Sequence, residues 1–332
     1  MRKFQTGDQT VSARILAAIL IAGIVILDQA GMVQAQNPQV RQLERIGPAT
    51  QPQTNALEVV GSKEAEESGD LGKQVILQTV PRVRMFEIFS DTQVIYDSNP
   101  LLVRNQEKAD GLLYQTFQLS FTPHLVDKLV TSMYLRYQFI RYFDNSRFDF
   151  DALGAGLNLG YPVLDWLTAY GGWSAERLDE AHGGNTFYEE YDTQLGLRAS
   201  FPLGKRANYF FGYQFDWRPS DPHEFNRVDH FAFLGLNLQL IEKLTAQFLY
   251  RFRYEDYLED SKVLVDLGPP VITTRKSRSD IENLVSFALV YPFNEYVNVR
   301  AYVLYSNNDS TRRIFDYDVV NVGGGLNLSF RF

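Results

Sequence analysis

From residue 83 to the end of the chain, apolar and polar residues alternate in segments that recur about every forty residues. Six of these segments end in an apolar residue, at Phe121, Tyr161, Phe201, Leu240, Tyr291 and Phe332. The steps between these ends are 40, 40, 39, 51 and 41 residues. Alternation with a period of two predicts β-strands that have one apolar and one polar face. A regular step of this size indicates a repeated supersecondary unit.

Each step holds two strands and two connections of unequal length. Five connections are short, at 122–128, 162–166, 202–206, 241–243 and 292–295. Six are polar and mostly longer, at 97–110, 143–147, 178–186, 219–226, 259–279 and 307–316. Outer-membrane barrels have an even number of antiparallel strands, short periplasmic turns and longer external loops. Residues 83–332 are therefore predicted to be all-β, an up-and-down antiparallel transmembrane β-barrel of about 12 strands. Ten or fourteen strands are the alternatives if 83–96 or 259–279 is misassigned.

The side chains of single segments support membrane-crossing strands. Residues 208–218 supply the roughly 9–11 residues that such a strand needs. Within this segment Tyr209, Phe211 and Tyr213 share one face, and Asp216 and Arg218 lie on the other. A soluble sandwich or propeller also alternates faces, but propeller repeats hold four short strands rather than two long ones. The mean hydropathy of −0.23 fits a membrane barrel, because its apolar and polar faces cancel in any average.

The first 35 residues have the pattern of a secretory signal peptide. Arg2, Lys3 and Arg14 precede an apolar run of 13 residues, 15–27, and small residues at Val33 and Ala35 suit a cleavage site. As a helix this run is about 20 Å long, shorter than the roughly 30 Å of hydrocarbon that an anchor must cross. We expect cleavage near Ala35 and export to the outer membrane.

Residues 36–82 form a segment of different composition. The stretch 36–56 is rich in Gln and Pro, and 63–70 is mostly charged or small. Such composition is typical of chains that do not fold on their own. We expect a flexible periplasmic tether. The alternative is a segment that folds back to plug the pore.

Together these features resemble the outer-membrane β-barrel, porin-like proteins of Gram-negative bacteria. The resemblance is carried by the end of the signal peptide, by the hairpin repeat and by the terminal strand 326–332 that ends in Phe332. It implies that Phe332 and Phe330 form the signal read by the outer-membrane assembly machinery, and that the barrel wall contacts outer-membrane lipid. Asn327 stands where a glycine is often found in such signals. The resemblance covers residues 83–332 and identifies no subfamily.

The polar faces of the strands give candidate residues for the lumen. They are Arg136, Arg198, Arg251, Arg253, Arg300, Glu190, Asp192 and Asp216. The arginines could form a track for an anionic solute, as in some twelve-strand channels for acidic sugars that are similar in this respect. The alternative, which we favour, is that the charges pair across the wall and brace it.

Other functions are disfavoured by composition and by missing motifs. The chain has no Cys, which excludes thiolate chemistry and disulfides, and its net charge of −8 gives no basic footprint for nucleic acid. Its four His residues lie in no recognisable catalytic spacing. We therefore expect no catalytic residue, no cofactor, no metal site and no enzymatic activity. The expected function is a narrow passive channel for small solutes. A non-conducting structural or adhesion barrel is the alternative, and a lipid-modifying enzyme is a weaker one; oligomeric state stays open.

Overall fold

A computed structural model describes residues 38–50, 85–102, 104, 108–123, 125–126, 128–259, 261–265, 272–276 and 278–332. The predicted signal peptide, residues 51–84 of the N-terminal segment and His124 lie outside the described residues.

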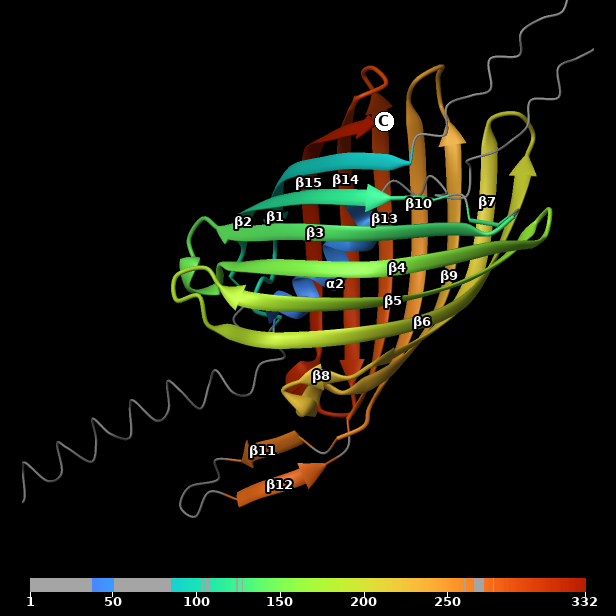
Figure 1. The fold of residues 1–332 in the computed structure, drawn as a ribbon. Coiled ribbons are helices and arrows are strands. Elements are labelled where there is room, and N and C mark those ends of the chain that lie inside the picture. Colours follow the sequence, from blue (N-terminus) through green and yellow to red (C-terminus); the bar gives the residue numbers. More distant parts are fainter. Residues whose placement is uncertain are drawn as a thin grey trace, which may run out of the picture.

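The structure is a closed, up-and-down antiparallel β-barrel of twelve strands, as predicted (Figure 1). Neighbouring strands in the wall also follow one another in the chain. The strands are β1 (Phe86–Asp97), β2 (Asp110–Phe121), β3 (Val130–Tyr142), β4 (Phe150–Leu164), β5 (Leu167–Glu180), β6 (Thr186–Leu203), β7 (Ala207–Arg218), β9 (Arg227–Gln239), β10 (Thr245–Tyr257), β13 (Ser279–Pro292), β14 (Val297–Ser310) and β15 (Tyr317–Arg331).

The barrel closes where the first strand meets the last. β1 pairs with β15 in antiparallel register from Glu87 opposite Arg331 to Asp97 opposite Asn321. Beyond this ladder, Phe86 and Phe332 exchange two backbone hydrogen bonds, of 3.1 and 3.0 Å between N and O. Closure leaves no strand edge in the wall, so the backbone groups of the strands pair within the sheet.

The length of the connections distinguishes the two ends of the barrel, as predicted from the sequence. Five short turns lie at one end, where both termini of the barrel domain also lie. The other end carries the longer loops, with the two-residue strand β8 (Ser220–Asp221), the hairpin β11 (Ser261–Val265) and β12 (Ile272–Lys276), and the 3-10 turns η1 (Ser146–Phe148), η2 (His223–Phe225) and η3 (Arg313–Phe315). We call these ends the short-turn end and the long-loop end.

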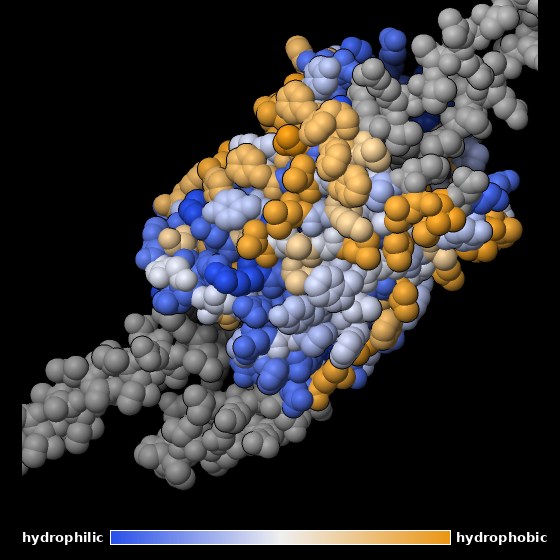
Figure 2. Space-filling view, in the orientation of Figure 1, coloured by the Kyte–Doolittle hydropathy of each residue, from blue (hydrophilic) through white to orange (hydrophobic). Residues whose placement is uncertain are grey.

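The wall turns its apolar side chains outward and its charged ones inward. On β7 the side chain of Phe211 is 46% exposed, while Asp216 on the opposite face is fully buried. Apolar residues cover much of the outer wall, and hydrophilic residues gather toward the long-loop end (Figure 2). A soluble protein places these residue types the other way round, so the outer surface suits contact with lipid. In the part of the chain that the structure describes, no helix is long and apolar enough to cross a membrane.

The described part of the N-terminal segment forms the helix α2 (Pro38–Thr50), which lies inside the barrel (Figure 1). For these thirteen residues the structure differs from the predicted flexible tether and matches the alternative of a segment folded back into the lumen. The physical reason is tertiary: a helix this short is marginal in water, and packing against the wall stabilises it.

The outward position of Phe211 generates a test of the barrel's orientation. Phe211→Arg should lower the free energy of unfolding by about 2–4 kcal/mol, because it places a guanidinium against lipid near the middle of the strand. Urea titration in lipid vesicles measures this change. Phe211→Leu is the control and should cost far less, and an equal cost for both variants would contradict a lipid-facing position.

The terminal ring generates a test of the assembly signal. Phe332 stacks on Phe86 at the closing seam, with 5.8 Å between ring centroids. Phe332→Ala and Phe86→Ala both remove this contact, and Phe86→Ala also removes the stacking of Phe86 on Phe121, with 4.8 Å between ring centroids. Phe86→Ala therefore removes more packing but leaves Phe332 unchanged. We expect Phe332→Ala to reduce the fraction of folded barrel in cells well below that of Phe86→Ala, as measured by heat-modifiable gel mobility. Equal losses would assign Phe332 a packing role only.

Candidate functional site: the lumen and its helix

The helix α2 has an apolar face that packs on one side of the lumen. Val40 and Ile46 are buried, and Leu43 packs beside them. The wall residues of the same cluster point inward from eight strands and include Ile95, Leu112, Ile140, Tyr142, Phe150, Leu178 and Tyr188. The spacing of three residues between Val40, Leu43 and Ile46 places them on one helical face. Apolar burial therefore holds this face to the wall.

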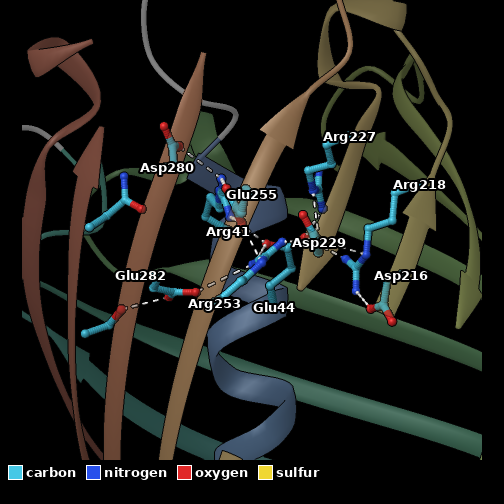
Figure 3. Close-up of polar contacts among 12 residues, drawn as sticks. Arg41, Glu44, Asp216, Arg218, Arg227, Asp229, Arg253, Glu255, Asp280 and Glu282 are labelled. Carbon is cyan, nitrogen blue, oxygen red and sulfur yellow. Dashed lines mark hydrogen bonds and ion pairs between the residues drawn. The ribbon is translucent and has the colours of Figure 1, made fainter. Parts of the chain in front are cut away.

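Beside this apolar face α2 carries Glu44, whose carboxylate lies among arginines of the wall (Figure 3). Its Oε1 accepts from Arg218 Nη1 at 2.9 Å and also from Arg227 Nη2. Its Oε2 accepts from Arg253 Nη1 at 2.7 Å. These arginines come from β7, β9 and β10, so one side chain of the helix joins three neighbouring strands.

Arg41 lies one helical turn before Glu44 and contacts acids of the wall. Its guanidinium forms a two-point ion pair with Glu255 and donates to Tyr257 Oη at 2.6 Å. Asp280 Oδ2 lies 3.6 Å from Arg41 Nη2. Within the helix, Arg41 Nη1 also donates to Glu44 Oε2 at 3.2 Å. Arg41 and Glu44 thus form an adjacent pair of opposite charges on the helix surface, the Arg41–Glu44 pair.

A third helix charge, Arg45, faces the closing seam. Its Nη2 lies 3.6 Å from Asp97 Oδ2 at the end of β1, and its guanidinium lies 5.6 Å from the ring centre of Tyr317 at the start of β15. Gln39 donates to the backbone carbonyl of Phe148 in the loop after β3, at 3.3 Å. All these partners belong to the long-loop end, so α2 occupies the lumen there.

The charge of Glu44 is fixed by its surroundings. Burial raises the pKa of this carboxyl. The guanidinium groups of Arg227, Arg253, Arg41 and Arg218 lower the same pKa, and their combined effect is larger. The net effect holds the pKa of Glu44 well below its usual range. The carboxylate therefore stays ionised, and its attraction to the wall is lost only as the pH falls through that lowered pKa.

Five of the predicted lumen residues belong to one ion-pair network around the helix. Arg253 contacts Asp229 at 2.8 Å and Glu255 at 2.5 Å, besides Glu44. Arg251 lies 3.3 Å from Glu282. The predicted acids of this network all contact Arg218, at 2.9 to 3.3 Å, and are Glu190, Asp192 and Asp216.

The other three predicted arginines lie in separate places on the wall. Arg136 pairs with Glu176 at 2.9 Å. Arg300 pairs with Asp91 at 3.1 Å, and Arg198 lies over the ring of Phe210, 4.1 Å from its centre. The five arginines thus do not form one continuous file. Arg136 and Arg300 each join two strands of the wall through a carboxylate partner.

Sequence reasoning missed the residues that link the helix to the wall. Arg41, Glu44, Arg227 and Asp229 were not among the candidates. Arg227 and Asp229 could have been found, because they alternate with outward residues at the start of a strand. On the helix, the signal was an apolar period of three from Val40 that a Gln- and Pro-rich composition obscured.

Three of the histidines lie in the described residues, two in loops at the long-loop end and one on the outer face of β9. Among the described residues, no group of three or more His, Asp or Glu is placed to hold a metal ion. His182 lies 3.4 Å from Asp149, His223 contacts the backbone carbonyl of Ser220, and His230 contacts Tyr213 on the outer face. None of these three contacts joins a His ring to a serine hydroxyl.

Fold and wall together define a transmembrane β-barrel of the outer-membrane type, with a lumen that holds a helix from its own N-terminal segment. No family model matches the chain, and no curated protein matches it. Among solved structures, an outer membrane channel from Pseudomonas putida F1 is similar, with a TM-score of 0.49, 10% identity, and coverage of 78% of this chain and 100% of that one.

Two further solved structures illustrate the range of similar proteins. The NanC porin has a TM-score of 0.40 and 13% identity over 72% of this chain and 98% of its own. The translocator domain of the autotransporter NalP from Neisseria meningitidis has a TM-score of 0.42 and 11% identity over 75% and 88%. These similarities are of barrel architecture, and no functional argument rests on them.

The position of Glu44 generates a test of how the helix is held. Glu44→Gln should weaken docking of α2 by about 3 kcal/mol, because three buried guanidinium groups lose one of their ionic partners. Hydrogen exchange of the α2 amides measures the free energy of this local opening. Glu176→Gln breaks the single, less buried pair with Arg136 and should leave exchange in α2 unchanged. Slow exchange retained in Glu44→Gln would show that apolar packing alone holds the helix.

Proposed function

We propose that the protein is an outer-membrane channel for small solutes whose long-loop end is closed by the helix α2. The observation that carries the proposal is the position of α2 across the lumen, with contacts to wall residues from β1, β7, β9, β10 and β13. Solute passes when the helix leaves this position. Selection by such a channel comes from the charges and width of the lumen, and it needs no catalytic residue.

The side chains that line the lumen support a water-filled path on one side of the barrel. From β4 to β7 the inward residues Asn158, Tyr170, Gln194 and Gln214 are half-buried, and hydrogen bonds of 3.0 to 3.2 Å connect them. Polar groups of this kind remain satisfied when water replaces a neighbour. This side of the lumen therefore suits the passage of a polar solute.

A non-conducting structural barrel is the second candidate, and the apolar cluster of the lumen favours it. Ile95, Leu112 and Ile140 point inward and are fully buried beneath α2. They meet water if the helix leaves, which costs roughly 25 cal/mol for each Å² of apolar surface exposed. On this alternative α2 is a permanent part of the core.

Export and membrane assembly complete the proposal. The mature chain begins after cleavage near Ala35, a few residues before α2. The outward aromatic and aliphatic side chains contact outer-membrane lipid, and Phe332 with Phe330 is read by the assembly machinery. The proposal includes no enzymatic activity, cofactor or nucleic acid.

Single-channel recording in a planar bilayer separates the two candidates. The mature protein should be closed most of the time, and a variant that lacks residues 36–50 should show stable, discrete currents. Val40→Asn/Ile46→Asn, which weakens the apolar face of α2 in the full chain, should raise the open fraction at least several-fold. Heat-modifiable gel mobility checks that each variant is folded. Folded barrels that pass no current in any of these forms would support the structural barrel.

A further inference from the structure

The wall beside α2 has two adjoining half-sites of opposite charge preference. The first, the carboxylate half-site, consists of Arg218, Arg227 and Arg253, which together bind the Glu44 carboxylate. The side chains of Arg227 and Arg253 are only 2% and 1% exposed. A cradle of three converging guanidinium groups binds carboxylates through charge-assisted hydrogen bonds.

The arginines of this half-site are held in place by the wall itself. Arg253 Nη2 donates to Asp229 at 2.8 Å, and Arg227 Nε donates to the same carboxylate at 3.3 Å. Arg218 Nη2 donates to Asp216 at 2.9 Å. These bonds do not involve the helix, so the cradle is positioned independently of Glu44. Asp229 and Asp216 also repel an approaching anion, which disfavours a solute that carries negative charge alone.

The second, the cation half-site, consists of Glu255, Tyr257 and Asp280. All three face the guanidinium of Arg41 and are buried, Glu255 and Asp280 completely. Neighbouring arginines partly balance the acids: Arg253 lies on Glu255, and Arg278 donates to Asp280. Arg41 completes this balance, because two carboxylates and a phenol oxygen converge on one guanidinium.

We propose that these half-sites are a binding site for zwitterionic solutes, with the carboxylate on Arg218, Arg227 and Arg253 and the cationic group on Glu255, Tyr257 and Asp280. The Arg41–Glu44 pair occupies this site in the structure and stands in for such a solute, an amino acid or short peptide. When the helix leaves, a molecule with both charges restores both sets of contacts, whereas one with a single charge fills only one of the two half-sites. This inference rests on the proposed channel function and names the solute class.

Chemical rescue in the full mature chain tests the site without depending on conductance. Arg41→Ala/Glu44→Ala keeps the apolar face of the helix and removes the charges that fill both half-sites. L-arginine at constant ionic strength should raise the unfolding temperature of this variant saturably toward that of the natural protein. Agmatine, which lacks the carboxylate, and acetate, which lacks the cation, should each give less than half of that shift.

The single variants test each half-site and guard against failure of the double variant to fold. Acetate should stabilise Glu44→Ala, and methylguanidinium should stabilise Arg41→Ala. Acetate added to Arg41→Ala, or methylguanidinium added to Glu44→Ala, should have no effect. Val40→Ala is the matched control: it weakens the same helix without removing charge, so no compound should act on it. Arg227→Gln added to Glu44→Ala should remove the response to acetate.

The outcomes separate this inference from the channel proposal. Saturable, matched rescue with no current in any variant leaves the binding site standing and ends the channel proposal. Currents without rescue leave the channel and overturn the site. Equal stabilisation by sodium chloride, by agmatine or in Val40→Ala would also overturn it, since the effect would then be one of ionic strength or of solvent.

Discussion

Backbone hydrogen bonding in a medium without water is the constraint from which the rest of this structure follows. Lipid offers no partner to an N–H or C=O group, so a wall of strands must close on itself. Here the ladder between β1 and β15 makes that closure. Because side chains alternate along each strand, the register that closes the barrel also fixes which residues face lipid and which face the lumen.

The inward face creates a second requirement, because buried charges need partners. The wall supplies most of them through pairs such as Arg300 with Asp91 and Arg251 with Glu282. The helix supplies the others at the long-loop end. A barrel of twelve strands is wider than one of about eight, which side chains alone fill, and a helix with side chains is about 10 Å across. An amphipathic helix suits this lumen because one side of it is apolar and the other is charged.

In the proposed channel, closure of the lumen and recognition of the solute involve the same contacts. A solute that replaces Glu44 and Arg41 on the wall must satisfy the same guanidinium and carboxylate groups. The charges of the docked helix therefore indicate the charges that a competing solute must carry. A solute shifts the equilibrium between docked and undocked helix only by the difference in its affinity for the two states. On this proposal, the strength of the ion pairs between α2 and the wall determines both how firmly the lumen is closed and how well a solute must match the wall.

The sequence by itself determined the barrel, and the tertiary structure decided what fills it. Alternation with a period of two is local, so it predicted twelve strands, the outward position of Phe211 and the inward position of Arg253. The sequence pattern did not predict the helix α2, because thirteen residues rich in Gln and Pro have little helical stability of their own. They gain that stability by packing against the wall. Partners were equally hidden: Glu44 and Arg253 lie 209 residues apart, and only the insertion of α2 into the barrel brings them together. Periodicity shows which face a charge occupies, but its partner depends on how distant strands and the helix meet.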